Sequence, residues 1–497
     1  MSEEKAAALH SRYNPQGEAD RYINALSLSE ETRFFILIEP GLGYMIAPLR
    51  KKFPGAKIIA LHVNAPAPPD GWQGSQSLQA ALQPPDSRWD PGAGIPAQDF
   101  LEREIPDSPA AQIRILEWRP ALAVYGSAYR ALVEESAAFI KRSDANARTT
   151  SAFGKRWFRN FFRNLEIIRT VVRPAPFSLP VLVTGAGPGL EEALPLVHER
   201  RPCFFVLAVS SSVAALRAAG IAPDMVVGTD GGQWAAFHLS DCFRRSGPPD
   251  GQPPFPGPLA AALTAALPSQ CEAVPVLPIS DGSLWQTLIL KELDIPFVAL
   301  PQRGTVCATA LDAAFALTSG DIFIAGIDLE NSGIRSHARP YALDWFLEGN
   351  SGRVNPVYSQ AFKRAALLKA GGTYSIYASW FEKQLAAYPK RLYSIGKNNR
   401  VFSPVKTASF QTMPDKEAAS LPAAFKRITL RRTGSPSRKA RGVLERALRD
   451  PAHAPALRKE LAPILAGGSA EPSLEELAGG LLGGSAEHQP RREYKSF

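Results

Sequence analysis

The chain has 497 residues, of which 45% are hydrophobic, a composition that allows large buried cores in two or three domains. Its formal net charge of +9 is concentrated between positions 426 and 449, where there are nine Lys and Arg residues and a single acidic residue, Glu445. The rest of the chain is close to neutral, so the basic composition gives no reason to expect a nucleic-acid-binding protein.

The cysteines and the apolar runs indicate the cellular compartment in which the protein is expected. The four cysteines, Cys203, Cys242, Cys271 and Cys307, are too far apart in sequence for a zinc ribbon or a redox pair. The first residues, MSEEKAAALHSRY, lack the apolar core of a signal peptide. The run Leu259–Leu267 is too short for a membrane-spanning helix and is flanked by prolines. We therefore expect a reduced, cytoplasmic protein without a transmembrane segment.

Residues 1–175 are predicted to form a smaller α/β domain that ends in a long helix. Apolar strands are expected at Phe34–Ile38 and Lys57–Val63, joined through the glycine turn Glu39–Tyr44 and a short helix. Whether that turn binds a ligand is left open. Residues 65–96 are rich in Pro, Gly, Asp and Gln and read as a long loop, and Leu122–Tyr125 could be a further strand.

The segment from Tyr129 to Val172 has a helical pattern with interleaved aromatic and basic residues. Trp157, Phe158, Phe161 and Phe162 alternate with Arg156, Arg159 and Arg163. Such interleaving can stack nucleic-acid bases, but at helical spacing it favours aromatics in the core and arginines in solvent. Residues 173–180 are read as a proline-rich linker.

Residues 176–350 are predicted to form a central, Rossmann-like domain with a parallel sheet. Buried strands at Val181–Thr184, Cys203–Val209 and Met225–Val227 alternate with helices at about Leu190–Arg200 and Val213–Ala219. This spacing is typical of a doubly wound sheet, in which ligands bind at the carboxyl ends of the strands. The residues that follow these strands are therefore candidate nucleotide-binding residues: Gly185, Gly187, Pro188, Gly189, Ser210, Ser211 and Asp230.

The glycine turn itself fits neither common phosphate-binding motif. It lacks the Lys-Ser/Thr ending of an ATPase phosphate loop, and Leu190 stands where a dinucleotide fingerprint has its third glycine. Glu191 and Glu192 in the first helical turn would repel a pyrophosphate placed there. The turn could therefore contact a ligand or only close a strand–helix corner.

The second half of this domain adds further candidates. Gly304 and Thr305 precede a helix rich in small residues, and IFIAGIDL, a buried strand, ends at Gly326 and Asp328. The loop after it carries Glu330, Arg335 and His337. A surface loop at 244–258 lies near the predicted strand ends and could act as a lid.

The remaining residues are predicted to be mainly helical. Positions 351–413 read as a helical subdomain that completes the core, with a last strand at Arg391–Ile395. Positions 414–497 read as a basic, flexible helical tail with the phrase GGSAE occurring twice. The tail's charge could contact an acidic partner or a membrane surface.

Three stretches together resemble a known family: GAGPGLEEALP, AVSSSVAALRAAGIAPDMVVGTD and GTVCATALDAAFALTSGDIFIAGIDLENSGIRSHA. They look like the central domain of the motility-associated-factor glycosyltransferases, which also carries the name 6-hydroxymethylpterin diphosphokinase-like. The likeness covers roughly Arg12 to Pro404 and extends to bacterial sialyltransferases that use a CMP-sugar. It implies a sialyltransferase-like fold and transfer of a nonulosonic acid from a CMP-activated donor to Ser or Thr of a protein, flagellin in that family.

The chain departs from those sialyltransferases at several positions. Ser210–Ser212 and Asp230 stand where they carry asparagines, and their phosphate-contacting tyrosines after Gly-Ile-Asp are replaced here by Glu330, Arg335 and His337. Transfer needs a stabilised leaving phosphate and a base for the acceptor hydroxyl. We expect His337 as the base and Arg335 or Arg339 at the phosphate, with Asp328 and Asp230 contacting donor hydroxyls, and no metal or other cofactor.

Two other classes of function stay open. The carboxylates of Asp230 and Asp328 could instead hold Mg²⁺, which would suit an ATP-dependent pyrophosphokinase acting on a pterin-like alcohol. A non-catalytic protein with a nucleotide-binding fold, working through its basic tail, is the third class. Acceptor recognition by the flanking domains favours the transferase.

Overall fold

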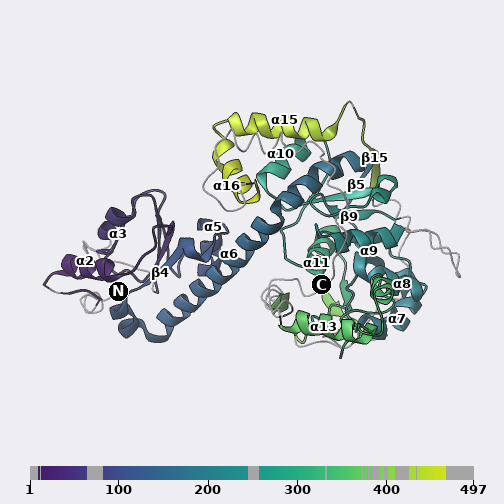
Figure 1. Ribbon diagram of the computed structural model, residues 1–497, viewed down its shortest axis with the longest axis horizontal. Coiled ribbons are helices and arrows are strands. Elements are labelled where there is room, and N and C mark those ends of the chain that lie inside the picture. Colours follow the sequence, from purple (N-terminus) through teal and green to yellow (C-terminus); the bar gives the residue numbers. More distant parts are fainter. Residues whose placement is uncertain are drawn as a thin grey trace. The chain divides into compact units, whose positions relative to one another are not determined.

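The computed structural model of the chain divides into two compact units, one up to Gly154 and one from Lys155 to Leu465 (Figure 1). It describes residues 9–465 except for position 12 and the ranges 64–81, 244–256, 331–332, 371–373, 375–376, 379–380, 383–384, 386–390, 397–400, 409–424 and 433. The expected lid at 244–258 therefore lies almost wholly outside the described residues. No helix in the described ranges has the length and apolar character needed to cross a membrane.

The first unit is a small α/β domain built on a parallel sheet. Its strands are β1 (Phe34–Ile38), β2 (Lys57–Leu61), β3 (Ser87–Trp89) and β4 (Ile113–Glu117), in the order β3-β2-β1-β4. Helices α2 (Pro15–Ala25), α3 (Ile46–Lys52) and α5 (Ala97–Glu104) accompany them. The strand expected at Leu122–Tyr125 is wrong, because those residues belong to helix α6 and the strand lies just before them, at β4. Pro120, in the first turn of α6, is well placed to start a helix.

Helix α6 (Arg119–Ile167) is the long helix expected from the sequence. Its backbone leaves helical geometry at Gly126, where φ is 54°. The part from Lys155 onward belongs to the second unit. There Phe158, Phe161 and Phe162 are buried in the core, whereas the arginines between them are exposed. The core interpretation of the aromatic–basic pattern is thus confirmed.

The second unit is built on one large, mostly parallel sheet. The strands are β5 (Thr170–Pro174), β6 (Val181–Thr184), β7 (Phe205–Val209), β8 (Met225–Gly228), β9 (Leu259–Ala262), β10 (Val276–Ser280), β11 (Val298–Ala299), β12 (Ile322–Ala325), β13 (Leu392–Ser394), β14 (Lys406–Thr407) and β15 (Phe425–Thr429). They lie in the order β14-β13-β12-β6-β7-β8-β9-β10-β5-β15, with β11 beside β10. Only β15 runs antiparallel among the described pairs. The predicted α/β class with a parallel central sheet is confirmed.

Both faces of this sheet are covered, because alternate residues of each strand point to opposite sides. One core contains Leu182 and Val206 and packs against the end of α6 and helices α7 (Leu190–Glu199), α8 (Val213–Ala218), α9 (Gln233–Phe243) and α10 (Leu284–Glu292). The other contains Val183 and Leu207 and packs against α11 (Val306–Leu317). Helices α12 (Asp344–Gly349) and α13 (Val357–Ala370) follow β12 in sequence.

The described part of the C-terminal region, 425–465, is packed into the second unit and is not a loose tail. Strand β15 pairs with β5 over five residues, and α15 (Pro436–Arg449) and α16 (Ala454–Leu465) contact α10 (Figure 1). The reason is the apolar stripe of α15, whose buried residues recur at helical spacing: Ala440, Val443, Leu444, Ala447 and Leu448. The many charged residues between these positions make the stripe hard to recognise in the sequence. The rest of the predicted tail, residues 414–424 and 466–497, lies outside the described residues.

Candidate functional site

The carboxyl ends of four neighbouring strands meet at one edge of the central sheet. Strands β12, β6, β7 and β8 are adjacent and parallel, with Val181 opposite Ile322 and Phe205. The loops that follow them therefore lie side by side. These loops contain every strand-end residue singled out from the sequence: Gly185, Gly187, Pro188, Gly189, Ser210, Ser211, Asp230, Gly326 and Asp328. Their common location follows from the fold.

The glycine turn after β6 packs directly on the end of β12. The backbone N–H of Gly187 donates to the carbonyl oxygen of Gly326 at 2.7 Å, and that of Gly189 donates to Oδ2 of Asp328 at 2.5 Å. A Cβ at position 187 would lie 2.6 Å from the Asp328 carboxyl group. Position 187 is thus a glycine because the loop that carries Asp328 leaves no room for a side chain.

Asp328 is consequently engaged in holding the turn. Burial raises the pKa of its carboxyl group, the hydrogen bond from Gly189 lowers it, and the charges of Glu330 and Glu192 raise it further. Gly326 has a φ of +68°, and a Cβ there would lie 2.7 Å from Cβ of Leu190. The turn-capping role considered for Asp328 is present in the structure, and its contact with donor hydroxyls stays a prediction.

The other strand-end candidates differ in accessibility. Ser210 is buried and Ser211 is half-buried, while the neighbouring Ser212 is fully buried with its hydroxyl 3.0 Å from that of Thr184. Asp230 is exposed and accepts a hydrogen bond from the backbone N–H of Gly232 at 2.8 Å. Ser211 and Asp230 are therefore the candidates on these two loops that are open to a ligand.

Helix α6 fixes the loops after β8 and β9 through two amide side chains. Asn160 donates to the carbonyl oxygen of Thr264 at 3.0 Å and to that of Gly231 at 3.4 Å. The buried Asn164 donates to the carbonyl oxygens of Leu263 and Ala265 at 2.8 and 2.7 Å. Helix α6, for which the sequence predicted only a role in the core, thus also fixes the loops at the predicted site.

The loop that follows β12 folds back over the glycine turn. The backbone N–H of Ala338 donates to the carbonyl oxygen of Ala186 at 2.8 Å. Arg335 forms an ion pair with Glu191 at 2.9 Å, and the other oxygen of Glu191 accepts from the backbone N–H of Arg339 at 2.9 Å. Glu191 therefore binds this loop, and the guanidinium of Arg335 already has a carboxylate partner.

A cavity of about 440 Å³ lies between this loop and helices α12 and α13. Its lining includes Arg335, His337, Arg339, Tyr341, Asp344 and Arg364. The ring of His337 stacks on that of Tyr341, with centroids 4.1 Å apart and an interplanar angle of 18°. Nδ1 of His337 lies 2.8 Å from the hydroxyl of Ser336. The cavity places the predicted base beside a cation and a phenol.

Tyr341 joins Arg364 to a second buried histidine, His238. Arg364 donates to the Tyr341 hydroxyl at 3.1 Å, and that oxygen lies 3.1 Å from Nε2 of His238. The hydroxyl oxygen accepts from the guanidinium and either donates to Nε2 of His238 or accepts from it, depending on the tautomer of His238. Nδ1 of His238 is buried and has no hydrogen-bond partner in the described part of the chain.

Burial and the same guanidinium keep both histidines neutral. Burial, with the charge of Arg364 and the proximity of His238, lowers the pKa of His337 to about 3. Burial, with Arg364, lowers the pKa of His238 to about 4. The cation that lowers the pKa of His337 is therefore Arg364.

Two tyrosines near the site, Tyr374 and Tyr377, were not predicted, because no tyrosine directly follows Gly326-Ile327-Asp328 in the sequence. Burial raises the pKa of Tyr374, with Asp328 and Tyr341 among the charges that act on it. Burial raises the pKa of Tyr377, with contributions from Asp230 and Cys307. A Cβ at Gly304 would lie 3.8 Å from the ring of Tyr377, so the loop of Gly304 and Thr305 belongs to the same edge. The sequence feature that could have indicated them is the cluster YSIY at 374–377, in the expected helical subdomain.

Three further observations concern possible ligand and metal sites outside this cavity. The glycine turn of the first unit is filled by His10, whose Nε2 accepts from the backbone N–H of Leu42 at 2.9 Å. In the described ranges, no group of three or more His, Cys, Asp or Glu side chains is placed to hold a metal ion. All four cysteines are free thiols.

Comparison with known proteins agrees with this architecture. Residues 155–333 match the family model described as 6-hydroxymethylpterin diphosphokinase MptE-like. An uncharacterized protein of Treponema pallidum (strain Nichols) is 29% identical over 318 residues, which are 63% of this chain and 66%, just under two thirds, of that protein. A MAf glycosyltransferase from Magnetospirillum magneticum AMB-1 superposes with a TM-score of 0.50 at 14% identity, covering 97% of this chain and 77% of that one.

The chain therefore resembles the MAf glycosyltransferases in fold and carries an MptE-like central domain. This bears out the resemblance drawn from the three sequence stretches. The likeness to sialyltransferases stays a prediction.

Proposed function

We propose that the protein is a glycosyltransferase that moves a nonulosonic acid from a CMP-activated donor to a Ser or Thr hydroxyl of a protein, with flagellin as the acceptor suggested by the family resemblance. The fold shared with a MAf glycosyltransferase supports transfer of a sugar. The observation that carries the proposal is the cavity that brings His337 together with Arg364 and Tyr341.

In the proposed reaction, His337 takes the acceptor proton. The acceptor oxygen forms a bond to the anomeric carbon of the sugar, the bond from that carbon to the phosphate oxygen of CMP breaks, and CMP leaves with the electron pair. The hydroxyl proton passes to Nε2 of His337. This requires the tautomer in which Nδ1 carries the proton and donates to Ser336, 2.8 Å away.

The leaving phosphate would be stabilised by Arg364 and Tyr341. A guanidinium and a phenol can both donate hydrogen bonds to phosphate oxygens, and such bonds are strong when one partner is charged. Arg364 suits this role better than Arg335, because Arg335 is already paired with Glu191. Ser211 and Asp230, the accessible strand-end residues, would contact the nucleoside.

The match of residues 155–333 to the MptE-like family favours a second candidate, an ATP-dependent pyrophosphokinase acting on a pterin-like alcohol. That reaction would require Mg²⁺ at carboxylates such as Asp230 and Asp328. Asp328 is buried and bonded to the glycine turn, an arrangement that supports the transferase in preference to the kinase.

A thermal-shift screen with CMP, CDP, UDP, GDP and ATP, each with and without Mg²⁺, separates these functions. A ligand at a hundred times its Kd stabilises the fold by about 2.7 kcal/mol. We expect CMP to raise the melting temperature without metal. A shift with Mg²⁺–ATP and none with CMP would reject the transferase in favour of the kinase.

A further inference from the structure

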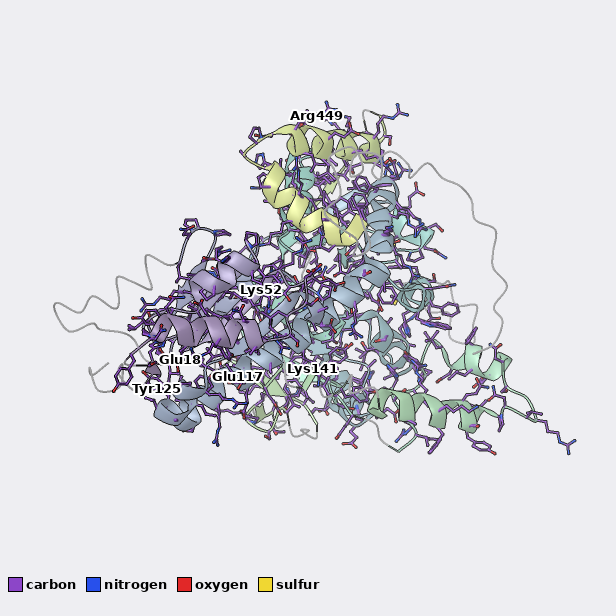
Figure 2. All side chains as sticks on the ribbon, turned by 60° about the vertical axis from the view of Figure 1, so that its left-hand side comes forward. Glu18, Lys52, Glu117, Tyr125, Lys141 and Arg449 are labelled. Atoms are coloured by element: carbon purple, nitrogen blue, oxygen red, sulfur yellow. The ribbon has the colours of Figure 1, made fainter. Side chains whose placement is uncertain are left out.

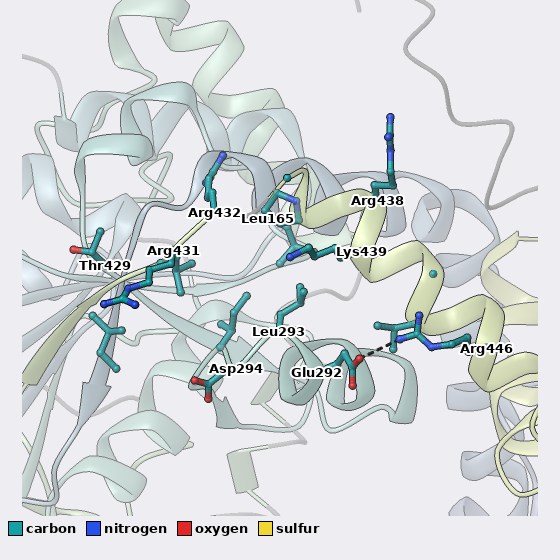
Figure 3. A pocket seen from close by; sticks show the side chains of 17 residues that line it. Leu165, Glu292, Leu293, Asp294, Thr429, Arg431, Arg432, Arg438, Lys439 and Arg446 are labelled. Atoms are coloured by element: carbon teal, nitrogen blue, oxygen red, sulfur yellow. Dashed lines mark hydrogen bonds and ion pairs between the residues drawn. The ribbon is translucent and has the colours of Figure 1, made fainter.

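A second and larger cavity lies far along the sheet, at the β5–β15 edge of the second unit. It is a groove of about 840 Å³ between helix α15, residues 428–432 and the end of α10 (Figure 3). Its lining carries five cations and two carboxylates, a net charge of +3. The charged side chains are those of Arg431, Arg432, Arg438, Lys439, Arg446, Glu292 and Asp294. Nothing in the proposed transfer reaction uses this groove.

The positive charge of the groove is only partly balanced by ion pairs, which join Arg446 to Glu292 and Arg432 to Glu166. In the described part of the chain, the guanidinium groups of Arg431 and Arg438 form no ion pair, and both residues are exposed. Arg446 is paired with Glu292 at 3.1 Å, but both side chains are more than half exposed. The first turn of α15 has no acidic residue of its own, but its backbone N–H at Ser437 donates to the carboxylate of Glu166, which offsets the positive end of the helix dipole.

The wall of the groove is held in place by Glu166 of α6. Its carboxylate accepts hydrogen bonds from the hydroxyls of Ser435 and Ser437 at 2.5 and 2.7 Å. Burial raises the pKa of Glu166, but these hydrogen bonds and the nearby Arg432 outweigh it and lower the pKa overall. Arg432 also donates to the carbonyl oxygens of Glu166 and Ile168. Arg432 is thus a structural residue, and Arg431 and Arg438 are the exposed cations that a ligand can reach.

The cations are spread along the groove and do not converge on one point. Arg438 and Arg446 are eight residues apart on one helix, which is about 12 Å along its axis. Figure 3 shows Arg431 and Arg446 at opposite ends of the groove, with Lys439 between them. A single phosphate group could contact only one or two of these side chains. The arrangement suits a ligand with several negative charges along an extended chain.

The floor of the groove is apolar. Leu293, Ile428 and Leu430 are half-buried, and Leu165, Ile295 and Val443 close the floor beneath them. A nucleic acid backbone or a small polyanion would leave this apolar surface uncovered. A peptide that carries both carboxylates and leucine- or isoleucine-like side chains would cover it.

We propose that this groove, lined by α15 and β15, binds an acidic, leucine-bearing segment of a partner protein. Carboxylates of the segment pair with Arg431 and Arg438, and its apolar side chains cover Leu293 and Leu430. The proposal does not depend on the transfer reaction.

Fluorescence anisotropy with the full chain and a labelled synthetic peptide of alternating Glu-Glu-Leu units tests it. We expect binding that weakens as salt is raised, and loss of about tenfold in affinity in Arg431→Gln or Arg438→Gln. Gly442→Leu, which fills the groove without changing its charge, should weaken binding as well. The matched control is Arg449→Gln, at the exposed end of α15 and outside the groove (Figure 2), which should bind normally.

Equal affinity of the Arg438→Gln and Arg449→Gln proteins would overturn the proposal. So would equal binding of a peptide with Gln in place of Glu, or of one with Ser in place of Leu. Tighter binding to vesicles of anionic phospholipid, or to a single-stranded oligonucleotide, than to the peptide would also overturn it, because either result would assign the groove to another class of partner.

Discussion

Arg364 donates a hydrogen bond to the hydroxyl of Tyr341 at 3.1 Å, and its guanidinium carbon lies 5.2 Å from the centroid of the same ring. One cation thus orients the phenol and faces the histidines on either side of it, His238 and His337. An anionic ligand entering the cavity would meet a guanidinium whose position is already fixed by an aromatic ring.

Replacing Arg364 by Ala should weaken CMP binding by about ten- to a hundredfold, because a charged hydrogen bond to the phosphate is lost. Isothermal titration calorimetry measures the affinity. Arg353→Ala is the control, since Arg353 is exposed and does not line the cavity. Unchanged CMP affinity in the Arg364→Ala protein would place the phosphate elsewhere.

The buried histidines should make the protein less stable as the pH falls. The pKa of His238 drops from 6.5 to about 4, and that of His337 to about 3, so the unfolded chain binds protons that the folded chain refuses. The two neutral histidines therefore leave the free energy of unfolding unchanged above about pH 6.5, and they lower it progressively as the pH falls toward 4. Melting temperatures between pH 6.5 and 5, above the range of most carboxyl groups, measure this.

His238→Gln should flatten that slope, because glutamine keeps a hydrogen-bonding group near Tyr341 but does not titrate. Replacement of the exposed His198 by Gln is the control and should leave the slope unchanged. The same slope in the His238→Gln and wild-type proteins would show that His238 is protonated in the folded state, contrary to its burial.

Gly187→Ala should destabilise the fold by about 1–3 kcal/mol, since the added Cβ would lie 2.6 Å from the Asp328 carboxyl group. Urea unfolding measures the change. Gly349→Ala, where an added Cβ would have no neighbour within 4 Å, should be nearly neutral. If the two variants are equally stable, the turn can move away from Asp328, and its glycines would be free to serve a ligand.

Leu444→Ala should cost about 2–5 kcal/mol of unfolding free energy, because Leu444 is fully buried in the core shared by α10, α15 and α16. Removing residues 425–497 should prevent folding of the second unit for the same reason. A stable truncated protein, or a Leu444→Ala variant that unfolds like Arg449→Ala, would restore the separable tail expected from the sequence.

The sequence revealed the central sheet because its strands are short, apolar and followed by turn residues. Val181–Thr184 and Ile322–Ala325 are examples whose position and carboxyl-terminal turns were predicted correctly. Strands β5, β9 and β15 were missed. Leu259–Ala262 has the composition of a helix, and Phe425–Thr429 alternates apolar and basic residues within a charged region. Their strand structure depends on pairing with distant partners.

The candidate site was only partly visible for a similar reason. His337 follows a strand whose end could be placed, so its location could be predicted. Arg364 and Tyr374 come from a helical region far along the chain, and no local pattern connects them to the strand ends. The pairing of Arg335 with Glu191, across 144 positions, is equally invisible before the chain is folded.

The central claim, transfer from a CMP-activated sugar with His337 as base, is tested most directly by the rate of CMP release from a CMP-activated nonulosonic acid in the presence of a protein acceptor. The wild-type protein should release CMP without added metal. The His337→Ala protein should do so about 10²–10⁴-fold more slowly while its melting temperature still rises with CMP. Equal rates in the two proteins would remove His337 as the base, and no release by the wild-type protein together with consumption of Mg²⁺–ATP would contradict the transferase itself.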